Sequence, residues 1–490
     1  METPVLVGVA QISQRTEALD ERKEPVDLMI DASRAAAEDA GCPRLAAQAG
    51  SIRVIRGYWP YQNPARAIGE ALGNSAAETA LTPFGGNFVQ TVVNRSVLDI
   101  QAGSHEVILI TGAECGHTRA RLRRAGAKPD WRSIDGTPDL HIGEDVTMGH
   151  PAELALGIDR PIRMYPIMET ARRHHLGEAV DAHIARISEL WASFSAVAAE
   201  NPHAWLRQAK TAAEIRSHSA ANRPVSFPYP KFMNSNSNVD QGAALILCSE
   251  RKAQALGVPR RKWVYPWAGA DAHDHYLVSN RDNLHSSPAI RLAARRALEW
   301  ADWQPAALDH VDLYSCFPIA VQVAAAEVGL NGSNGSDAKL PLTVTGGLTF
   351  AGGPLNNYVM HAIARMAEVL RGDPGGKGLV SANGGYLTKH AIGLYSTQPP
   401  PRPFRHEAPQ AEVDALPARD LVADHKGQAT VEGYSVMYGP EGPEVAHIAG
   451  RLGGGERTWA NCRDADTLDA MIQQEFCGRS MSLNAGEARF

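Results

Sequence analysis

Two of the six cysteines stand beside residues that could turn a thiol into a nucleophile. Cys115 follows Glu114 at the end of an apolar run, and His117 lies two residues further on. A histidine and a nearby helix N-terminus lower the pKa of a thiol, and the resulting thiolate can attack an acyl group. Cys316 lies two residues after Tyr314, at the end of another apolar run. For both cysteines the alternative is a buried thiol without a chemical role.

Composition excludes several other classes of chemistry and location. No two cysteines form a C-x-x-C pair, so neither a disulfide framework nor a metal site is expected. The 48 Lys and Arg against 54 Asp and Glu give a net charge of −6, which supplies no basic field for nucleic acid or an anionic membrane. There is no apolar run of 18 residues and no signal-peptide pattern at the N-terminus. We therefore expect a cytoplasmic protein that does not bind a membrane.

A repeated unit indicates how the chain positions its reactive residues. Residues 81–87 (LTPFGGN) lead into an amphipathic helix ending at Gly103 and then a strand, and residues 348–354 (LTFAGGP) lead into a helix ending at Gly372 and another strand. Two such copies predict a pair of sheets related by a pseudo-twofold axis. The Gly-Gly pairs let a ligand or another backbone approach each helix start. Neither copy has the spacing of a phosphate loop or a dinucleotide fingerprint.

Four segments are expected. Strand and helix alternate in the first and third segments, which favours an α/β class, whereas the second segment is basic and helical. The predicted boundaries are an N-terminal half at 1–118 plus 235–257, an inserted loop domain at 119–234, a C-terminal half at 258–398 and an additional domain at 404–490. The prolines at 399–403 predict an extended linker.

The sequence of the tail predicts a small β-barrel. Residues 427–452 form two alternating runs across a Gly-Pro-Glu-Gly-Pro turn, which is a hairpin pattern. With one more strand and a short helix this predicts an OB-like domain. Such barrels can bind single-stranded nucleic acid, but acidic residues outnumber basic ones here, which disfavours that use. We expect a chain that ends near Gln398 to stay folded without this domain.

Residues 3–398 resemble the thiolase superfamily, in its sterol-carrier thiolase branch. The resemblance rests on the two Gly-Gly units, the G-A-E strand end at 112–114, the basic insertion and the stretch 234–250 (NSNSNVDQGAALILCSE). It implies a duplicated αβαβα fold with a loop domain, similarity to acetyl-CoA acetyltransferases, and a place in lipid metabolism. It also implies CoA or acyl-CoA as a ligand, with no covalently bound cofactor. Thiolases often form homodimers, and a monomer is the alternative.

The residues that carry thiolase chemistry are absent from all four loops where the resemblance places them. The position of the nucleophilic cysteine falls at Gly86, and that of its activating histidine at Gly353. The histidine that orients the oxyanion water is replaced by Tyr314, and the second catalytic cysteine by Ala382. We therefore expect thiolase activity to be lost.

Other functions remain open. Cys316 or Cys115 could replace the missing nucleophile, giving an acyltransferase or another acyl-CoA-processing enzyme. Alternatively, the two halves could serve as a scaffold for a partner protein.

A CoA site needs cations for the phosphates and an apolar path for the pantetheine arm. Residues 119–132 hold six basic residues and one aspartate, although such runs are often solvated faces. The segment before the DQGAAL strand resembles the part of sterol-carrier thiolases that borders pantetheine. The residues expected to contact CoA are Arg123, Arg124, Lys231, Asn236 and Asn238.

Overall fold

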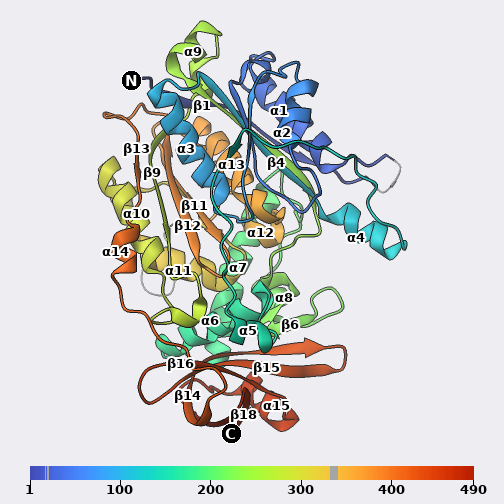
Figure 1. Ribbon diagram of the computed structural model, residues 1–490, viewed down its shortest axis with the longest axis vertical. Helices are drawn as coiled ribbons and strands as arrows, with labels where there is room; N and C mark the ends of the chain where they lie inside the picture. Colours follow the sequence, from blue (N-terminus) through green and yellow to red (C-terminus); the bar gives the residue numbers. More distant parts are fainter. Residues whose placement is uncertain (17, 19–20, 331–339) are drawn as a thin grey trace.

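The first half of the molecule is built on a mixed sheet. The structure is a computed structural model that describes residues 1–16, 18, 21–330 and 340–490 (Figure 1). The strand order is β1-β8-β4-β2-β3-β5, with β8 antiparallel to both neighbours and the rest parallel. All residues of β4 and β8 are buried, as in strands covered on both faces. The strands are β1 (Pro4–Ser13), β2 (Ser51–Val54), β3 (Glu78–Leu81), β4 (Val107–Cys115), β5 (Leu140–His141) and β8 (Asp240–Ser249).

The second half repeats this arrangement. Its sheet has the order β10-β11-β12-β9-β13, and the run β9-β12-β11-β10 corresponds to β1-β8-β4-β2 of the first sheet. In both runs the second strand is antiparallel to its neighbours and the last two strands are parallel. The predicted duplication is therefore confirmed. The strands are β9 (Tyr265–His273), β10 (His310–Asp312), β11 (Lys377–Gly384), β12 (Lys389–Ser396) and β13 (Arg405–Glu407).

The two helices that follow the Gly-Gly loops form the central layer. α3 (Phe88–Ala102) packs on strands of both sheets, and so does α13 (Tyr358–Gly372), while the two helices also touch each other. α1 (Pro25–Asp39) covers the outer face of the first sheet and α10 (Pro288–Ala301) that of the second. This helix–sheet–helix–sheet–helix order confirms the expected αβαβα layers.

Most of the inserted segment, from α5 (Pro151–Ala155) onward, lies between the layered core and the C-terminal end of the chain, whereas α4 (Gly116–Arg124) projects from the side of the core (Figure 1). The other helices of the segment are α6 (Pro161–His175), α7 (Val180–Glu200) and α8 (Ala212–Arg216), and its strands beyond β5 are β6 (Pro224–Phe227) and β7 (Tyr229–Pro230). The remaining helices of the two halves are α2 (Pro64–Ala71), α9 (Glu250–Ala255), α11 (Pro318–Val328) and α12 (Gly347–Phe350). None of the helices in the described part of the chain is long and apolar enough to cross a bilayer.

The tail forms a closed barrel, as the sequence predicted. The ring of pairings runs β14-β15-β16-β18-β17 and returns to β14. Closure removes the free sheet edges that an open sheet would expose. The elements are α14 (Gln410–Asp414), β14 (Lys426–Gly439), β15 (Gly442–Arg451), β16 (Arg457–Cys462), α15 (Ala465–Gln473), β17 (Ser480–Asn484) and β18 (Glu487–Arg489).

The barrel is fastened to the rest of the molecule. β6 of the inserted segment pairs with β14, and β13 pairs with β9 of the second half, so residues just beyond the proline segment still belong to the core sheet. A Cβ on Gly433 would lie 2.5 Å from the carbonyl oxygen of Ile167 in α6, which shows how closely that helix approaches β14. The fully buried Arg457 donates to the carbonyl oxygens of Val278 (3.1 Å) and Ser279 (2.8 Å). These contacts argue against the expected independence of the tail.

Candidate ligand-binding site

A cavity of about 650 Å³ opens where loops of both halves meet the inserted segment. The loop before α3, the loop between β10 and α11, the end of β11 and the start of α6 all contribute to its wall. A volume of this size is within the usual range for small-molecule sites, roughly 300–1,000 Å³. The lining residues used below are Phe84, Gly86, Met148, Arg160, Tyr165, Asn234, Ser235, Ser237, Tyr314, Cys316, Phe317, Gly353, Asn356 and Asn383.

The structure leaves no room for a side chain at Gly86. A Cβ atom added there would lie 2.5 Å from the carbonyl oxygen of Asn383 and 2.6 Å from the hydroxyl oxygen of Tyr314. Real Cβ atoms essentially never approach another heavy atom below 3.0 Å. Tyr314 therefore fills the place where the resemblance puts the nucleophile.

Gly353 is enclosed in a similar way. A Cβ there would lie 2.4 Å from the hydroxyl oxygen of Ser235, and Ser235 belongs to the segment before β8 that also lines the cavity. Ala382 is buried and lines a separate void of about 10 Å³ rather than the large cavity. Three of the four positions that the sequence analysis named therefore line one cavity: Gly86, Tyr314 and Gly353. The fourth, Ala382, does not line it, but the next residue, Asn383, does.

Cys316 lies in the cavity wall as a neutral thiol. Its side chain is nearly buried, and burial raises the pKa of the thiol to about 12. Asn383 donates from Nδ2 to Cys316 Sγ (3.8 Å) and to the hydroxyl of Tyr165 (2.9 Å). The Oδ1 atom of Asn383 is buried and has no hydrogen-bond partner within the described residues, so it can accept a hydrogen bond from a ligand.

Cys115 is not activated, contrary to one reading of the sequence. The residue is fully buried, its Sγ donates to the carbonyl oxygen of Lys23 (3.6 Å), and burial together with the charges of Asp240 and Glu114 raises its pKa well above the ordinary value. The ring of His117 packs against Trp205 instead. The structure favours the buried-thiol alternative, because β4 ends inside the core, where burial and the neighbouring carboxylates outweigh the positive charge of Arg119.

The residues expected to contact CoA lie outside the cavity lining. Arg123 and Arg124 are exposed in the last turn of α4, and Lys231 is exposed after β7. Asn236 accepts from the backbone N–H of Asn238 (3.1 Å) and so shapes its own turn. The neighbouring residues Asn234, Ser235 and Ser237 line the cavity, and the cation at its wall is Arg160.

Sequence reasoning missed several lining residues. Phe84 lies in the first Gly-Gly motif, but the motif does not reveal that its ring faces the cavity. Met148 and Tyr165 come from the inserted segment, whose fold the basic composition did not specify. Asn383 follows Ala382 directly in the sequence, and only its contacts with Tyr165 and Cys316 reveal its place in the cavity wall.

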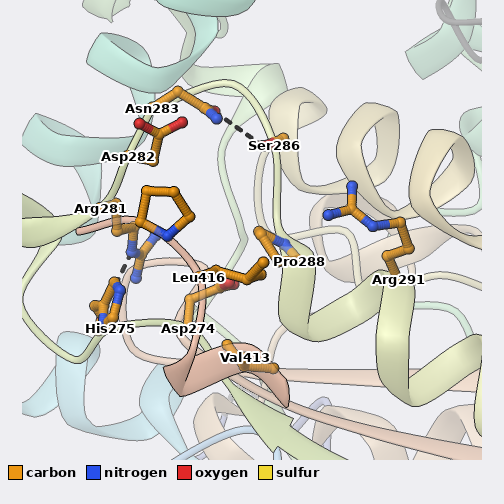
Figure 2. Close-up of a pocket in the computed structure, with 11 residues that line it drawn as sticks. Asp274, His275, Arg281, Asp282, Asn283, Ser286, Pro288, Arg291, Val413 and Leu416 are labelled. Atoms are coloured by element: carbon orange, nitrogen blue, oxygen red, sulfur yellow. Dashed lines mark hydrogen bonds between the residues drawn. The ribbon is translucent and has the colours of Figure 1, made fainter. Parts of the chain in front are cut away.

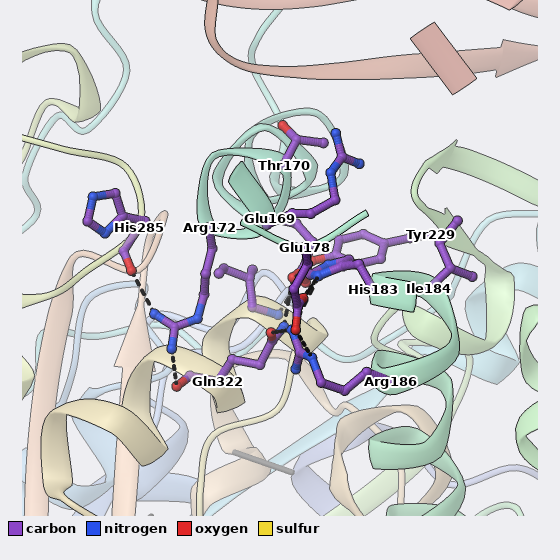
Figure 3. A network of polar contacts seen from close by, with 12 residues as sticks. Glu169, Thr170, Arg172, Glu178, His183, Ile184, Arg186, Tyr229, His285 and Gln322 are labelled. Atoms are coloured by element: carbon purple, nitrogen blue, oxygen red, sulfur yellow. Dashed lines mark hydrogen bonds and ion pairs between the residues drawn. The ribbon is translucent and has the colours of Figure 1, made fainter. Parts of the chain in front are cut away.

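A buried polar network supports the cavity wall from behind (Figure 3). The carboxylate of Glu169 contacts His183 Nε2 (2.9 Å), accepts from Gln322 Nε2 (2.7 Å) and accepts from the hydroxyl of Tyr229. The ring of Tyr229 stacks on Phe317, whose centroid is 5.6 Å away, and Phe317 lines the cavity. The network thus connects α6, α7 and α11 with one side of the site.

A second, smaller cavity of about 240 Å³ lies between the start of α10 and the α14 region (Figure 2). Its buried cation, Arg281, donates to the carbonyl oxygens of His275 (3.3 Å) and Tyr386 (2.9 Å) and to Thr388 Oγ1 (2.8 Å). Its other cation, Arg291, pairs with Glu327 (3.0 Å). Because the buried Arg281 is held by three hydrogen bonds and Arg291 by an ion pair, we interpret this cavity as a gap between packed elements.

Comparisons with known proteins agree with this architecture. A family model described as "Thiolase C-terminal domain-like" matches residues 270–397, and one described as "Thiolase-like protein type 1 additional C-terminal domain" matches residues 409–488. An acetyl-CoA acetyltransferase of Methanothermobacter thermautotrophicus is 23% identical over 313 residues, which are 61% of this chain and 72% of the relative.

Solved structures extend the similarity to the whole chain. A monomeric SCP2-thiolase-like protein type 1 from Mycobacterium smegmatis has 30% sequence identity and a TM-score of 0.84, and the match covers 100% of this chain and 99% of that one. Human mitochondrial 3-ketoacyl-CoA thiolase, at 16% identity and a TM-score of 0.56, matches 81% of this chain and 99% of its own, and shares the fold. The chain therefore belongs to the thiolase superfamily, as a relative of the SCP2-thiolase-like proteins of type 1.

Proposed function

We propose that this chain binds CoA or an acyl-CoA in the cavity beside Tyr314 and does not catalyse thiolysis. The observation that carries the proposal is the occupied space at Gly86, where Tyr314 and the Asn383 carbonyl exclude a cysteine side chain. Covalent acyl transfer needs a nucleophile together with its base. Glycine stands at the position that the resemblance gives to the nucleophile, Gly86, and at the position that it gives to the base, Gly353. The cavity has the size for an acyl-pantetheine arm, and Asn383 Oδ1 can accept from an amide N–H of that arm. Such a ligand would connect the protein with lipid metabolism.

Calorimetry and product analysis test the two halves of this proposal separately. We expect CoA, acetyl-CoA and acetoacetyl-CoA each to give saturable binding heat with the full chain. We expect no release of free CoA and no acyl mass increment on any cysteine. An absence of binding would contradict the first half, and turnover of acetoacetyl-CoA with CoA at a thiolase-like rate would contradict the second.

A second candidate function is acyl processing through Cys316, favoured by its position in the cavity wall. Its raised pKa opposes this role, because a thiol with a pKa of about 12 is almost entirely protonated near neutral pH. An acyl mass increment that disappears in Cys316→Ala but persists in Cys115→Ala would favour this candidate over simple binding.

A further inference from the structure

An open hollow of about 360 Å³ adjoins the cavity and shares Phe84 with it. The hollow is also lined by Arg56, Thr82, His141 and Asp145. The Phe84 side chain is 43% exposed, and few other large apolar side chains of the described residues are exposed to this degree. An exposed aromatic ring surrounded by charged groups at the edge of a cavity is a feature of ligand sites rather than of cores.

Arg56 brings to this hollow a positive charge that is not held in an ion pair within the described residues. Its guanidinium carbon lies 5.7 Å from the Phe84 ring centroid and 5.2 Å from that of Trp59. The guanidinium donates to the carbonyl oxygen of Tyr61 (3.3 Å) and takes part in no ion pair formed within the described ranges. The charge therefore remains available to an anionic ligand.

A second aromatic–guanidinium pair extends the same surface. Tyr58 is 65% exposed, and its ring lies edge-on to Phe84 with the centroids 6.5 Å apart. Arg119 lies over the Tyr58 ring at 4.7 Å and donates to the Tyr58 carbonyl oxygen (2.8 Å). The surface thus offers two exposed rings with two guanidinium groups beside them, of which that of Arg119 also pairs with Glu114 (3.7 Å).

The hollow and the cavity belong to one continuous wall. Asn356, which lines the cavity, donates from Nδ2 to the carbonyl oxygen of Arg56 (2.7 Å). Phe84 lines both spaces, so an elongated ligand that passes along its ring can occupy both. From this continuity we infer that the hollow between Arg56, Phe84 and Asp145 binds the adenine nucleotide end of CoA or acyl-CoA, an inference that rests on the proposed function.

The chemistry of this ligand matches the groups present. A purine ring stacks on exposed aromatic rings and on guanidinium planes. The exposed carboxylate of Asp145 can accept from the exocyclic amino group, and Arg56 can bind phosphate. The uncharged arm then lies in the larger cavity. This placement differs from the site that the basic run around Arg123 and Arg124 had suggested.

The test uses calorimetry on the full chain with three probes: CoA, adenosine 3′,5′-bisphosphate as the nucleotide without the arm, and pantetheine as the arm without the nucleotide. We expect Arg56→Met to weaken CoA and the bisphosphate about tenfold and to leave pantetheine unchanged. Tyr58→Ser and Asp145→Asn, both at exposed side chains, should act in the same direction without altering the melting temperature. Arg124→Met is the matched control and should bind all three probes like the parent.

The outcomes separate this inference from the proposed function. CoA binding that is unaffected by the three variants, or that is lost in Arg124→Met, overturns the nucleotide site while the cavity proposal stands. An absence of both CoA and pantetheine binding to the parent overturns the cavity proposal and this inference with it. A dimer in sedimentation that dissociates in Tyr58→Ser would show that the exposed rings bind a second copy, and would also overturn the inference.

Discussion

The hydroxyl oxygen of Tyr314 lies 2.6 Å from the point that a Cβ atom on Gly86 would occupy. The two residues are far apart in the sequence, yet one fills the space that the other leaves. The identities of these two residues are therefore coupled in space. We expect that a cysteine at Gly86 alone would not create a thiolase site, because the space for its side chain is already taken.

Gly86→Cys should destabilise the protein and leave thiolysis absent. Forcing extra atoms into a packed site costs about 1–3 kcal/mol, and the Asn383 carbonyl belongs to a strand that cannot move freely. Chemical denaturation of Gly86→Cys, alone and with Tyr314→Ala, measures this effect, and the second change should recover part of the loss. Gly372→Ala is the control, since nothing lies within 4 Å of a Cβ there. Equal stability of Gly86→Cys and the parent would contradict the packing argument.

Cys316 should react slowly with alkylating reagents in the folded protein. With a pKa of about 12, its thiolate fraction near pH 8 is small and increases about tenfold with each pH unit up to that pKa. Mass spectrometry after a short iodoacetamide pulse at several pH values gives the rate, with the half-buried Cys42 as an internal reference. Labelling of Cys316 at pH 7 as fast as that of Cys42 would show an activated thiol and favour the second candidate function.

The duplicated fold could be predicted because its signals are local. The two Gly-Gly motifs and the strands after them repeat in order and spacing, and the structure confirms both the duplication and the barrel. The absence of a cysteine at Gly86 could also be noted from the sequence, given the resemblance. The residue that fills the place of the cysteine could not be predicted from the sequence. Tyr314 reaches Gly86 only because the two halves pack together and bring their loops into contact.

The wall of the site was harder to predict than the fold. A basic run at the surface suggested cations for CoA at Arg123 and Arg124, but charge alone does not indicate which cations face a cavity. Arg56 is not part of a basic run, and the role proposed for it follows only from its contacts with Phe84 and Trp59. The proline segment suggested a separable tail, whereas the pairing of β6 with β14 joins residues about two hundred positions apart.

A chain ending at Gln398 should be unstable or insoluble. Removal of the barrel exposes the edge of β6 and leaves the carbonyl oxygens that Arg457 satisfies without a donor. Arg457→Met probes the same interface in the full chain. The buried Arg457 pairs with Glu432 at 2.8 Å, and breaking a buried pair costs about 3–5 kcal/mol.

Urea unfolding of Arg457→Met measures the loss of unfolding free energy, and Arg463→Met is the control. Arg463 pairs with Glu487 at the surface, where such pairs contribute up to about 1 kcal/mol. Equal, small effects of both substitutions, together with a cooperatively folded chain ending at Gln398, would show that the barrel is an independent unit.

The network around His183 should make stability depend on pH in a defined direction. Burial disfavours the charged imidazole, but its contacts with Glu169 (2.9 Å) and Glu178 (2.6 Å) outweigh this and raise the pKa of His183 above 6.5. A raised folded-state pKa contributes stability that is fully present below about pH 6.5 and is lost as the pH rises through the folded-state value. The pKa of Glu178 falls to about 2, so its own contribution persists in mildly acidic solution.

His183→Gln should therefore cost the most stability between about pH 5 and 6, and less by pH 9. Urea midpoints of the variant and the parent, measured at pH 5.5, 7 and 9, give the difference in stability at each pH. His310→Gln is the control, because its pair with Asp373 (2.8 Å) lies near the surface and far from this network in the sequence. A penalty for His183→Gln that stays constant with pH would mean that the imidazole is neutral in the folded protein and that the network contributes through hydrogen bonds alone. A penalty that grows toward pH 9 would contradict the sign of the shift itself.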